Sequence, residues 1–190
     1  MKKIIISLFV LLSVSVIPLT AQSRNSNEIY LGYGYPKTVG TSLIGGFTEI
    51  FSTIFTGGQA GMKTTGPGVA QIGYNRYLTD NIAVGGIFTF EPFTMTSNSG
   101  DNVNVSKNGL FSIQGTFKYQ YGWEWVRLYH GISMGVGINA FFDGGSPSAM
   151  FIMNLIPIGV KVGKDEGFNF FLDMGLWSTA LINAGASFSF

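Results

Sequence analysis

The chain has 190 residues, of which 46% are hydrophobic, 15% are aromatic and only 11% are charged. Few charges and many aromatic residues exclude a disordered chain, and a mean hydropathy of +0.31 is high for a soluble domain. The length fits a single domain. Because the sequence has no cysteine, disulfides, thiolate metal sites and lipid attachment to an N-terminal cysteine are excluded. The composition therefore makes a membrane protein a serious candidate.

The first residues have the pattern of a secretory signal peptide. Lys2 and Lys3 form a basic start, an apolar run follows over residues 4–17, and Ala21 offers a small residue for cleavage. The run is shorter than the ~20 residues of a membrane-spanning helix, which disfavours a retained anchor. We predict a signal peptide over 1–21 and an exported domain over 22–190. The exported part would carry nine basic and ten acidic residues, a balance that argues against nucleic acid as a partner.

Beyond residue 21 no stretch offers 18 uninterrupted apolar residues, so a membrane form of this chain must cross with strands. Apolar and small or polar residues alternate with a period of two, the pattern of strands with one apolar face. The last segment is the clearest, since Ile182, Ala184 and Ala186 alternate with Asn183 and Gly185. Pro157 removes one backbone donor and predicts a local distortion. Eight segments follow the pattern: 28–35, 68–77, 82–91, 110–121, 126–140, 149–163, 168–175 and 182–190.

The connections between these segments alternate in length. Residues 79–81, 122–124 and 164–166 are tight, and the segments 36–67, 96–108 and 143–148 on the other side are longer. Short turns at one end and long loops at the other are typical of outer-membrane barrels, and an even strand number lets the first and last strands pair. We therefore predict an all-β, eight-stranded antiparallel up-and-down transmembrane barrel, with both termini in the periplasm of a bacterium that has an outer membrane.

With these features the sequence resembles the small eight-stranded outer-membrane barrels of the OmpX, OmpA and OmpW types. The resemblance covers residues 28–190 and rests on the signal peptide, the strand count, the loop asymmetry and the ending Ala184-x-Ala186-x-Phe188-x-Phe190. It implies that Phe188 and Phe190 form the signal that the barrel-assembly machinery reads. It also implies outer-membrane lipid and lipopolysaccharide as surroundings.

Residues 42–56 depart from the strand pattern, because their apolar residues recur at helical spacing. We predict a short amphipathic helix in the first long loop. It would cover the barrel mouth or lie on the membrane interface. Alternatively, Phe47, Ile50 and Phe51 would form a gate or contact a small hydrophobic ligand. A ninth strand-like segment or disorder is the remaining interpretation.

Charged residues fall on the faces predicted to point inward. We expect Lys118 and Arg127 to lie within one diagonal of each other across the tight turn, with Glu91 and Asp173 as counter-charges. An eight-stranded barrel is just wide enough for side chains to fill. The simpler interpretation is therefore a polar core held by ion pairs and hydrogen bonds, and the alternative is a water-filled ion path or gate. The predicted lumen network consists of Glu91, Lys118, Arg127, Lys161 and Asp173.

Enzymatic chemistry finds little support in the sequence. His130 is the single histidine, and Ser133 lies three residues further on, so in a regular strand the two side chains point to opposite faces and cannot form a nucleophile–base pair. We predict no catalytic residue, metal or cofactor. The first hypothesis is a non-enzymatic envelope protein with a filled lumen. The second, implied by the OmpW resemblance, is a narrow channel or transporter that delivers small hydrophobic molecules laterally into the membrane; a lipid-modifying enzyme ranks third.

Overall fold

The computed structural model describes residues 26–36, 62–99, 102–176 and 180–190. The predicted signal peptide over 1–21 and the predicted helix over 42–56 lie outside these ranges. No helix in the described ranges is long and apolar enough to cross a membrane. The strands are β1 (Asn27–Pro36), β2 (Met62–Thr65), β3 (Val69–Tyr77), β4 (Ile82–Ser99), β5 (Asn102–Gly122), β6 (Val126–Phe141), β7 (Ser148–Gly163), β8 (Gly167–Leu176) and β9 (Ala180–Ser189).

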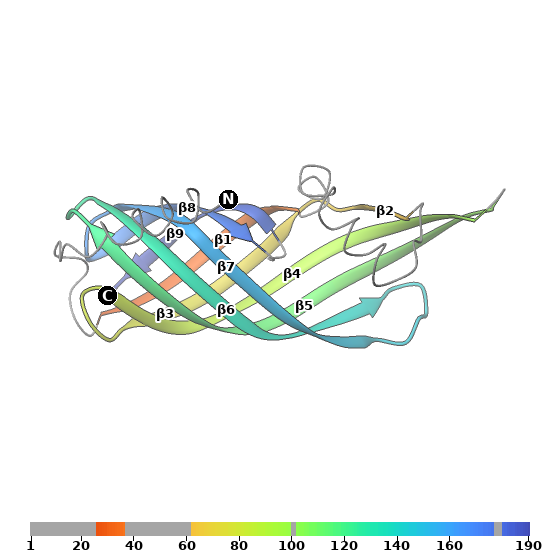
Figure 1. Ribbon diagram of the computed structural model, residues 1–190, viewed down its shortest axis with the longest axis horizontal. Coiled ribbons are helices and arrows are strands. Elements are labelled where there is room, and N and C mark those ends of the chain that lie inside the picture. The colour runs from red at the N-terminus through yellow and green to blue at the C-terminus, as the bar shows by residue number, and fades with distance from the viewer. Residues whose placement is uncertain (1–25, 37–61, 100–101, 177–179) are drawn as a thin grey trace, which may run out of the picture.

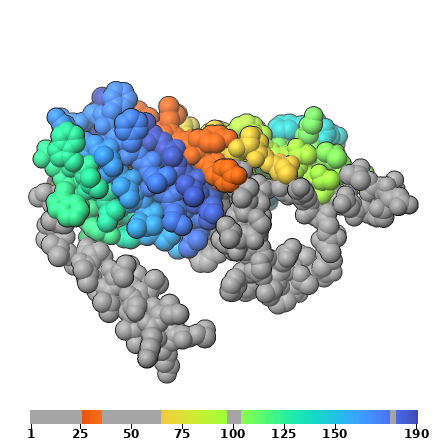
Figure 2. Space-filling view, turned by 90° about the horizontal axis from the view of Figure 1, so that it is seen from above, coloured from red at the N-terminus to blue at the C-terminus, as the bar shows by residue number. Residues whose placement is uncertain are grey.

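Eight of these strands close into an antiparallel barrel (Figure 1). Each strand from β3 to β8 pairs with its successor, and β1 pairs with both β3 and β9. At the closure Leu31 lies between Ile72 of β3 and Ala186 of β9. In Figure 2 the blue C-terminal strands lie directly against the orange β1. The predicted closed eight-stranded barrel is therefore confirmed.

Apolar and polar side chains are arranged inside out relative to a soluble protein. Ile113 is 66% exposed and Phe170 is 69% exposed on the outer wall, whereas Arg127 and Asn75 are 0% exposed in the interior. Among the described residues, buried polar or charged residues outnumber buried hydrophobic ones by 17 to eight. A wall of this kind is stable only against a hydrocarbon phase, since large contiguous apolar surfaces are not left in water.

The strands differ greatly in length. The barrel strands β1, β3, β8 and β9 have nine or ten residues, about what a tilted membrane strand needs. Strands β4 and β5 have 18 and 21 residues, and their hairpin projects beyond the barrel (Figure 1). The sequence-based expectation of a loop over 96–108 is therefore wrong, because β4 and β5 stay paired as far as Ser99 and Asn102. Within the predicted loop 36–67, β2 pairs with the same hairpin.

Pro157 disturbs the sheet as its missing N–H predicts. The pairing of β7 shifts register against both neighbours at this point. His130 lies opposite on β6, and its Nδ1 donates a hydrogen bond to the Pro157 carbonyl, while its Nε2 lies 3.0 Å from the Tyr121 hydroxyl. The imidazole thus binds the carbonyl of a residue that has no register partner on either neighbouring strand, a group that lipid cannot hydrate.

We expect His130→Phe to lower the free energy of unfolding by about 1–3 kcal/mol, because it removes the hydrogen bond to the Pro157 carbonyl in a water-poor region. Urea unfolding in lipid vesicles, followed by tryptophan fluorescence, measures the change. Tyr121→Phe is the control, since it removes only the hydroxyl that contacts Nε2 of His130. This variant should lower the free energy of unfolding by less. Equal losses in both variants would argue against the capping role.

Candidate functional site

Polar side chains fill the barrel interior in layers, beginning at the end that carries the short turns. Here Arg127 of β6 binds the β7–β8 turn. Its guanidinium lies 2.7 Å from the Asp165 carboxylate and donates to the Asn169 side chain at 2.7 Å and to the carbonyls of Gly163 and Lys164 at 2.9 Å each. Charge-assisted bonds of this kind are the strong ones. This layer therefore fixes the turn against the strands β6 and β8.

The second layer crosses the lumen. Lys161 of β7 donates to the Glu28 carboxylate of β1 at 2.6 Å, and both side chains are 4% exposed. The Tyr77 hydroxyl of β3 lies 3.0 Å from Glu28, from Lys161 and from the Gln120 side chain of β5. Asn75 also donates to Glu28, at 2.9 Å. Four strands are thereby joined through one buried ion pair.

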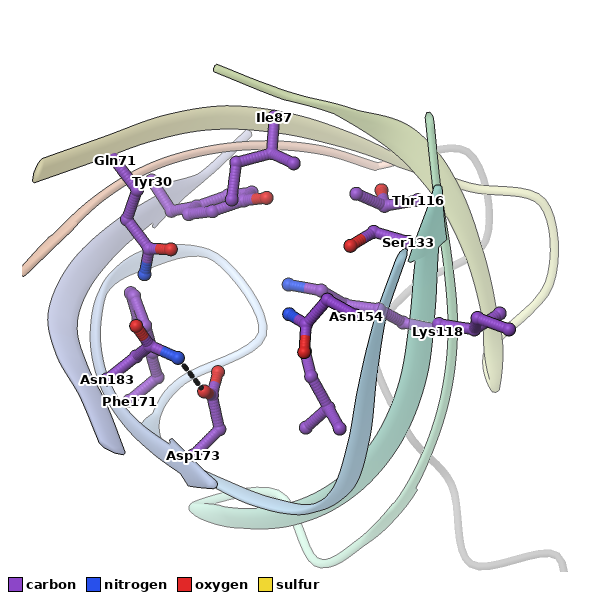
Figure 3. Close-up of a pocket in the computed structure, with 12 residues that line it drawn as sticks. Tyr30, Gln71, Ile87, Thr116, Lys118, Ser133, Asn154, Phe171, Asp173 and Asn183 are labelled. Atoms are coloured by element: carbon purple, nitrogen blue, oxygen red, sulfur yellow. Dashed lines mark hydrogen bonds between the residues drawn. The ribbon is translucent and has the colours of Figure 1, made fainter. Parts of the chain in front are cut away.

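The third layer is built around the Lys118 ammonium. It lies 4.4 Å from the centre of the Tyr30 ring and 5.3 Å from that of Tyr129, within the range of cation–π attraction. Tyr129 donates its hydroxyl to Asp173 at 2.7 Å, and Asn183 donates to the same carboxylate at 2.8 Å. Figure 3 shows Tyr30, Asp173 and Asn183 pointing into the interior from different strands.

Above this layer the contacts become neutral. The hydroxyls of Thr89 and Ser112 lie 2.6 Å apart, Gln114 donates to Ser112 at 2.8 Å, and Ser133 donates to Gln114 at 2.8 Å. Glu91 is buried further along β4, 8% exposed. The Arg127–Asp165 and Lys161–Glu28 ion pairs therefore lie towards the turn end, and the hydrogen bonds among Thr89, Ser112, Gln114 and Ser133 lie further along the lumen.

Little free volume remains between these layers. One cavity of about 20 Å³ is shown in Figure 3, and a second of about 10 Å³ lies nearer the turn end. Tyr30, Lys118 and Phe171 line both cavities and separate them. A single water needs about 10–15 Å³ of such space, so each cavity has room for about one water molecule.

Two expectations about charge pairing are wrong. Lys118 and Arg127 do not lie within one diagonal, because Lys118 pairs in register with Gly131 and Arg127 with Gly122, which separates them by about 13 Å. Glu91 is not a counter-charge for either cation, since its register partner on β5 is Leu110, about 26 Å along the strand from Lys118. Longer strands place it towards the opposite end of the barrel.

Arg127 instead stands directly opposite Lys161 in the β6–β7 register. Like charges in this position repel each other, and each cation has its own carboxylate: Asp165 for Arg127 and Glu28 for Lys161. Asp173 accepts hydrogen bonds from Tyr129 and Asn183. Of the five predicted lumen residues, the structure thus places Lys118, Lys161 and Asp173 near the middle layers.

Sequence reasoning missed Glu28, Tyr30 and Tyr77 as interior groups. The signal was available for the first two, because Glu28 and Tyr30 alternate with Ile29 and Leu31 over the start of β1. A tyrosine in such a strand is equally typical of the membrane interface, however. The next residues on the same face, Gly32 and Gly34, have no side chain that would identify the face as polar. The contact between Glu28 and Lys161 depends on the register of the whole barrel, which the sequence of either strand alone does not predict.

The remaining predicted site residues lie on the outer wall or beyond the described ranges. Phe188 and Phe190 are exposed at the turn end, where Phe188 packs against Phe168 with ring centres 5.1 Å apart. Phe47, Ile50 and Phe51 lie outside the residues that the structure describes. Within the described part, no group of three or more His, Asp or Glu residues could hold a metal ion.

We expect Lys161→Met to destabilise the folded barrel by about 3–5 kcal/mol, because it leaves the Glu28 carboxylate buried and unpaired. The double variant Glu28→Gln/Lys161→Met should recover much of that loss. Guanidinium unfolding in vesicles gives both values, and Lys164→Met in the exposed turn serves as the control. A double variant as unstable as the single one would contradict the ion pair's assigned role.

No protein-family model and no curated protein matches the chain. Among solved structures, it is similar to the N-terminal β-barrel domain of OprF from Pseudomonas aeruginosa, with 15% identity and a TM-score of 0.48 over 89% of this chain and 100% of that one. It is also similar to Ail, the attachment invasion locus protein of Yersinia pestis, in complex with the heparin analogue sucrose octasulfate, with 12% identity and a TM-score of 0.48 over 88% and 100%. A second structure of Ail gives 10% and 0.47 over the same shares.

These identities and scores are low, so the architecture is assigned from the strand pairing and the burial pattern. The sheet is closed, its outer wall is apolar and its interior is polar. Closed barrels and helices are the two structures that satisfy every backbone group in lipid. The described part of the chain therefore forms a closed eight-stranded antiparallel barrel with an apolar outer wall, the form that strands take when they cross a membrane.

Proposed function

We propose that this chain is a non-enzymatic outer-membrane protein whose filled lumen stabilises the barrel and whose projecting hairpin serves envelope structure or surface interaction. The observation that carries the proposal is the layered interior. Glu28, Lys161 and Tyr77 join strands across the lumen, and the two cavities above and below Lys118 are each about the size of one water. An interior of this kind supports stability rather than passage.

The orientation belongs to the same proposal. We place the short turns and both termini in the periplasm and the β4–β5 hairpin outside the cell. The backbone of Asn27 and that of Phe190 exchange two hydrogen bonds, at 2.7 and 2.9 Å, so the start of β1 and the chain end lie at the same end as the turns. Short turns on the periplasmic side and longer extensions outside are the usual arrangement of these barrels.

Lipid-modifying catalysis finds no support at His130. Its two ring nitrogens contact the Pro157 carbonyl and the Tyr121 hydroxyl, whereas Ser133 faces the interior and donates to Gln114. Lateral transport of a small hydrophobic molecule remains a prediction that depends on Phe47, Ile50 and Phe51 in the long first loop.

Planar-bilayer recording tests the closed lumen. The wild-type barrel is expected to give no sustained conductance, because Tyr30, Lys118 and Phe171 separate its cavities. Lys118→Ala addresses the lumen, and Lys164→Gln in the exposed turn is the matched control. A steady wild-type current that changes in Lys118→Ala but not in Lys164→Gln would reveal a continuous path and overturn the proposal.

A second prediction concerns assembly. Phe190→Ser keeps the backbone pairing with Asn27 but removes the terminal aromatic that the family resemblance makes an assembly signal. We expect lower amounts in the outer membrane with export to the periplasm intact, measured by fractionation. Phe168→Ser, which removes another exposed aromatic at the same end, is the control. Normal membrane levels of Phe190→Ser would contradict the assigned role.

A further inference from the structure

An open apolar depression of about 490 Å³ lies on the outer wall over β1, β3, β4 and β5. At its floor is Gly86, whose register partner on β5 is the outward-facing Gly115. The depression therefore marks a place where the barrel presents two adjacent side-chain positions without a side chain. Its walls are Ile29, Ile72, Tyr74, Phe88 and Ile113, together with Gly73 and Ile87.

The barrel itself does not require glycine at these two outward positions. A Cβ added at Gly86 would first meet an atom 3.7 Å away, and one at Gly115 would meet an atom 3.9 Å away, both ordinary contacts. The neighbouring Gly85 is different, since a Cβ there would lie 1.9 Å from the Tyr74 carbonyl oxygen. Backbone packing thus explains Gly85 but leaves the hollow at Gly86 unexplained.

A cation stands at the turn-side end of this depression. Arg76 is exposed on the outer face of β3, between Asn27 of β1 and Val84 of β4. Arg76 takes part in neither the Arg127–Asp165 nor the Lys161–Glu28 ion pair. Tyr74, which forms part of the depression wall, is the next outward residue on the strand, about 7 Å deeper into the barrel wall. The guanidinium therefore lies near the membrane surface, and the hollow begins one step further in.

We propose that this face binds one anionic phospholipid of the leaflet next to the short turns, with its phosphate on Arg76 and an acyl chain in the depression. The order along β3 matches that of the lipid, whose charged headgroup lies at the surface and whose chain runs inward. Guanidinium groups bind phosphate through paired, charge-assisted hydrogen bonds. The Tyr74 hydroxyl in the lining already donates a hydrogen bond to the Asn27 side chain at 2.6 Å. This inference rests on the proposed membrane barrel and adds a lipid partner to it.

Native mass spectrometry of the full mature chain, released from nanodiscs of equal parts phosphatidylglycerol and phosphatidylcholine, tests the site. The wild type should retain one phosphatidylglycerol in preference to phosphatidylcholine. Arg76→Gln should weaken that retention about tenfold, the effect of losing a charge-assisted hydrogen bond. Gly86→Leu should weaken it as well, because the new side chain occupies the depression while leaving the backbone undisturbed.

Two matched controls accompany these variants. Lys164→Gln removes an exposed cation from the β7–β8 turn, and Ala184→Leu enlarges an outward residue on β9; both should retain lipid like the wild type. Unchanged retention in Arg76→Gln, or an equal loss in Lys164→Gln, would overturn the site. If the wild type is a dimer and Gly86→Leu is a monomer, the face binds a second copy of the chain, and the lipid site is also overturned.

Heat-modifiable migration on gels tests the membrane barrel separately from the lipid site. Folded barrels migrate differently before and after boiling, so every variant is first scored for folding in lipid. A wild type that folds but shows no lipid preference overturns the lipid site alone. A wild type that fails to fold in lipid and stays compact in plain buffer overturns both proposals.

Discussion

The structure depends on one constraint: inside a bilayer every backbone N–H and C=O must find its partner within the protein. The pairing of β1 with β9 meets it, because this seam removes the last free edge of the sheet. Closure of the sheet then determines whether each side chain faces the lipid or the lumen. With a period of two along each strand, half of the residues face lipid and the other half are enclosed with no solvent to satisfy them.

The enclosed half must therefore satisfy its own charges. Arg127 and Lys161 face each other across neighbouring strands, an unfavourable arrangement if both shared one carboxylate. Instead, Asp165 comes from the adjacent turn and Glu28 from across the lumen. Each pairing also has a mechanical effect, since one holds a turn and the other joins opposite walls. The contacts that neutralise the interior are the same contacts that close it.

The sequence indicated which residues form strands and which way they face, because period-two alternation is a local property. It could not indicate which residues meet across the barrel. Glu28 and Lys161 are separated by 133 positions, and the register that joins them depends on every turn and on the bulge at Pro157. The error at 96–108 has another cause: this part of the hairpin projects beyond the barrel (Figure 1), where no enclosed lumen requires one polar face, so the alternation disappears and its Asn, Ser and Thr residues resemble a loop.

Glycine usage follows from the narrowness of the cylinder. The Tyr30 ring packs over Gly73 and the Tyr129 ring over Gly159, where an added Cβ would lie 2.1 and 2.2 Å from ring atoms. Tyr30 pairs in register with Gly73, and Tyr129 with Gly159, so each large inward side chain takes the space that its neighbour leaves empty. An eight-stranded barrel has just enough room for such pairs. Gly73 and Gly159 are thus imposed by the large side chains of the lumen, whereas an outward glycine such as Gly86 needs a cause outside the barrel, which in a membrane protein is the lipid.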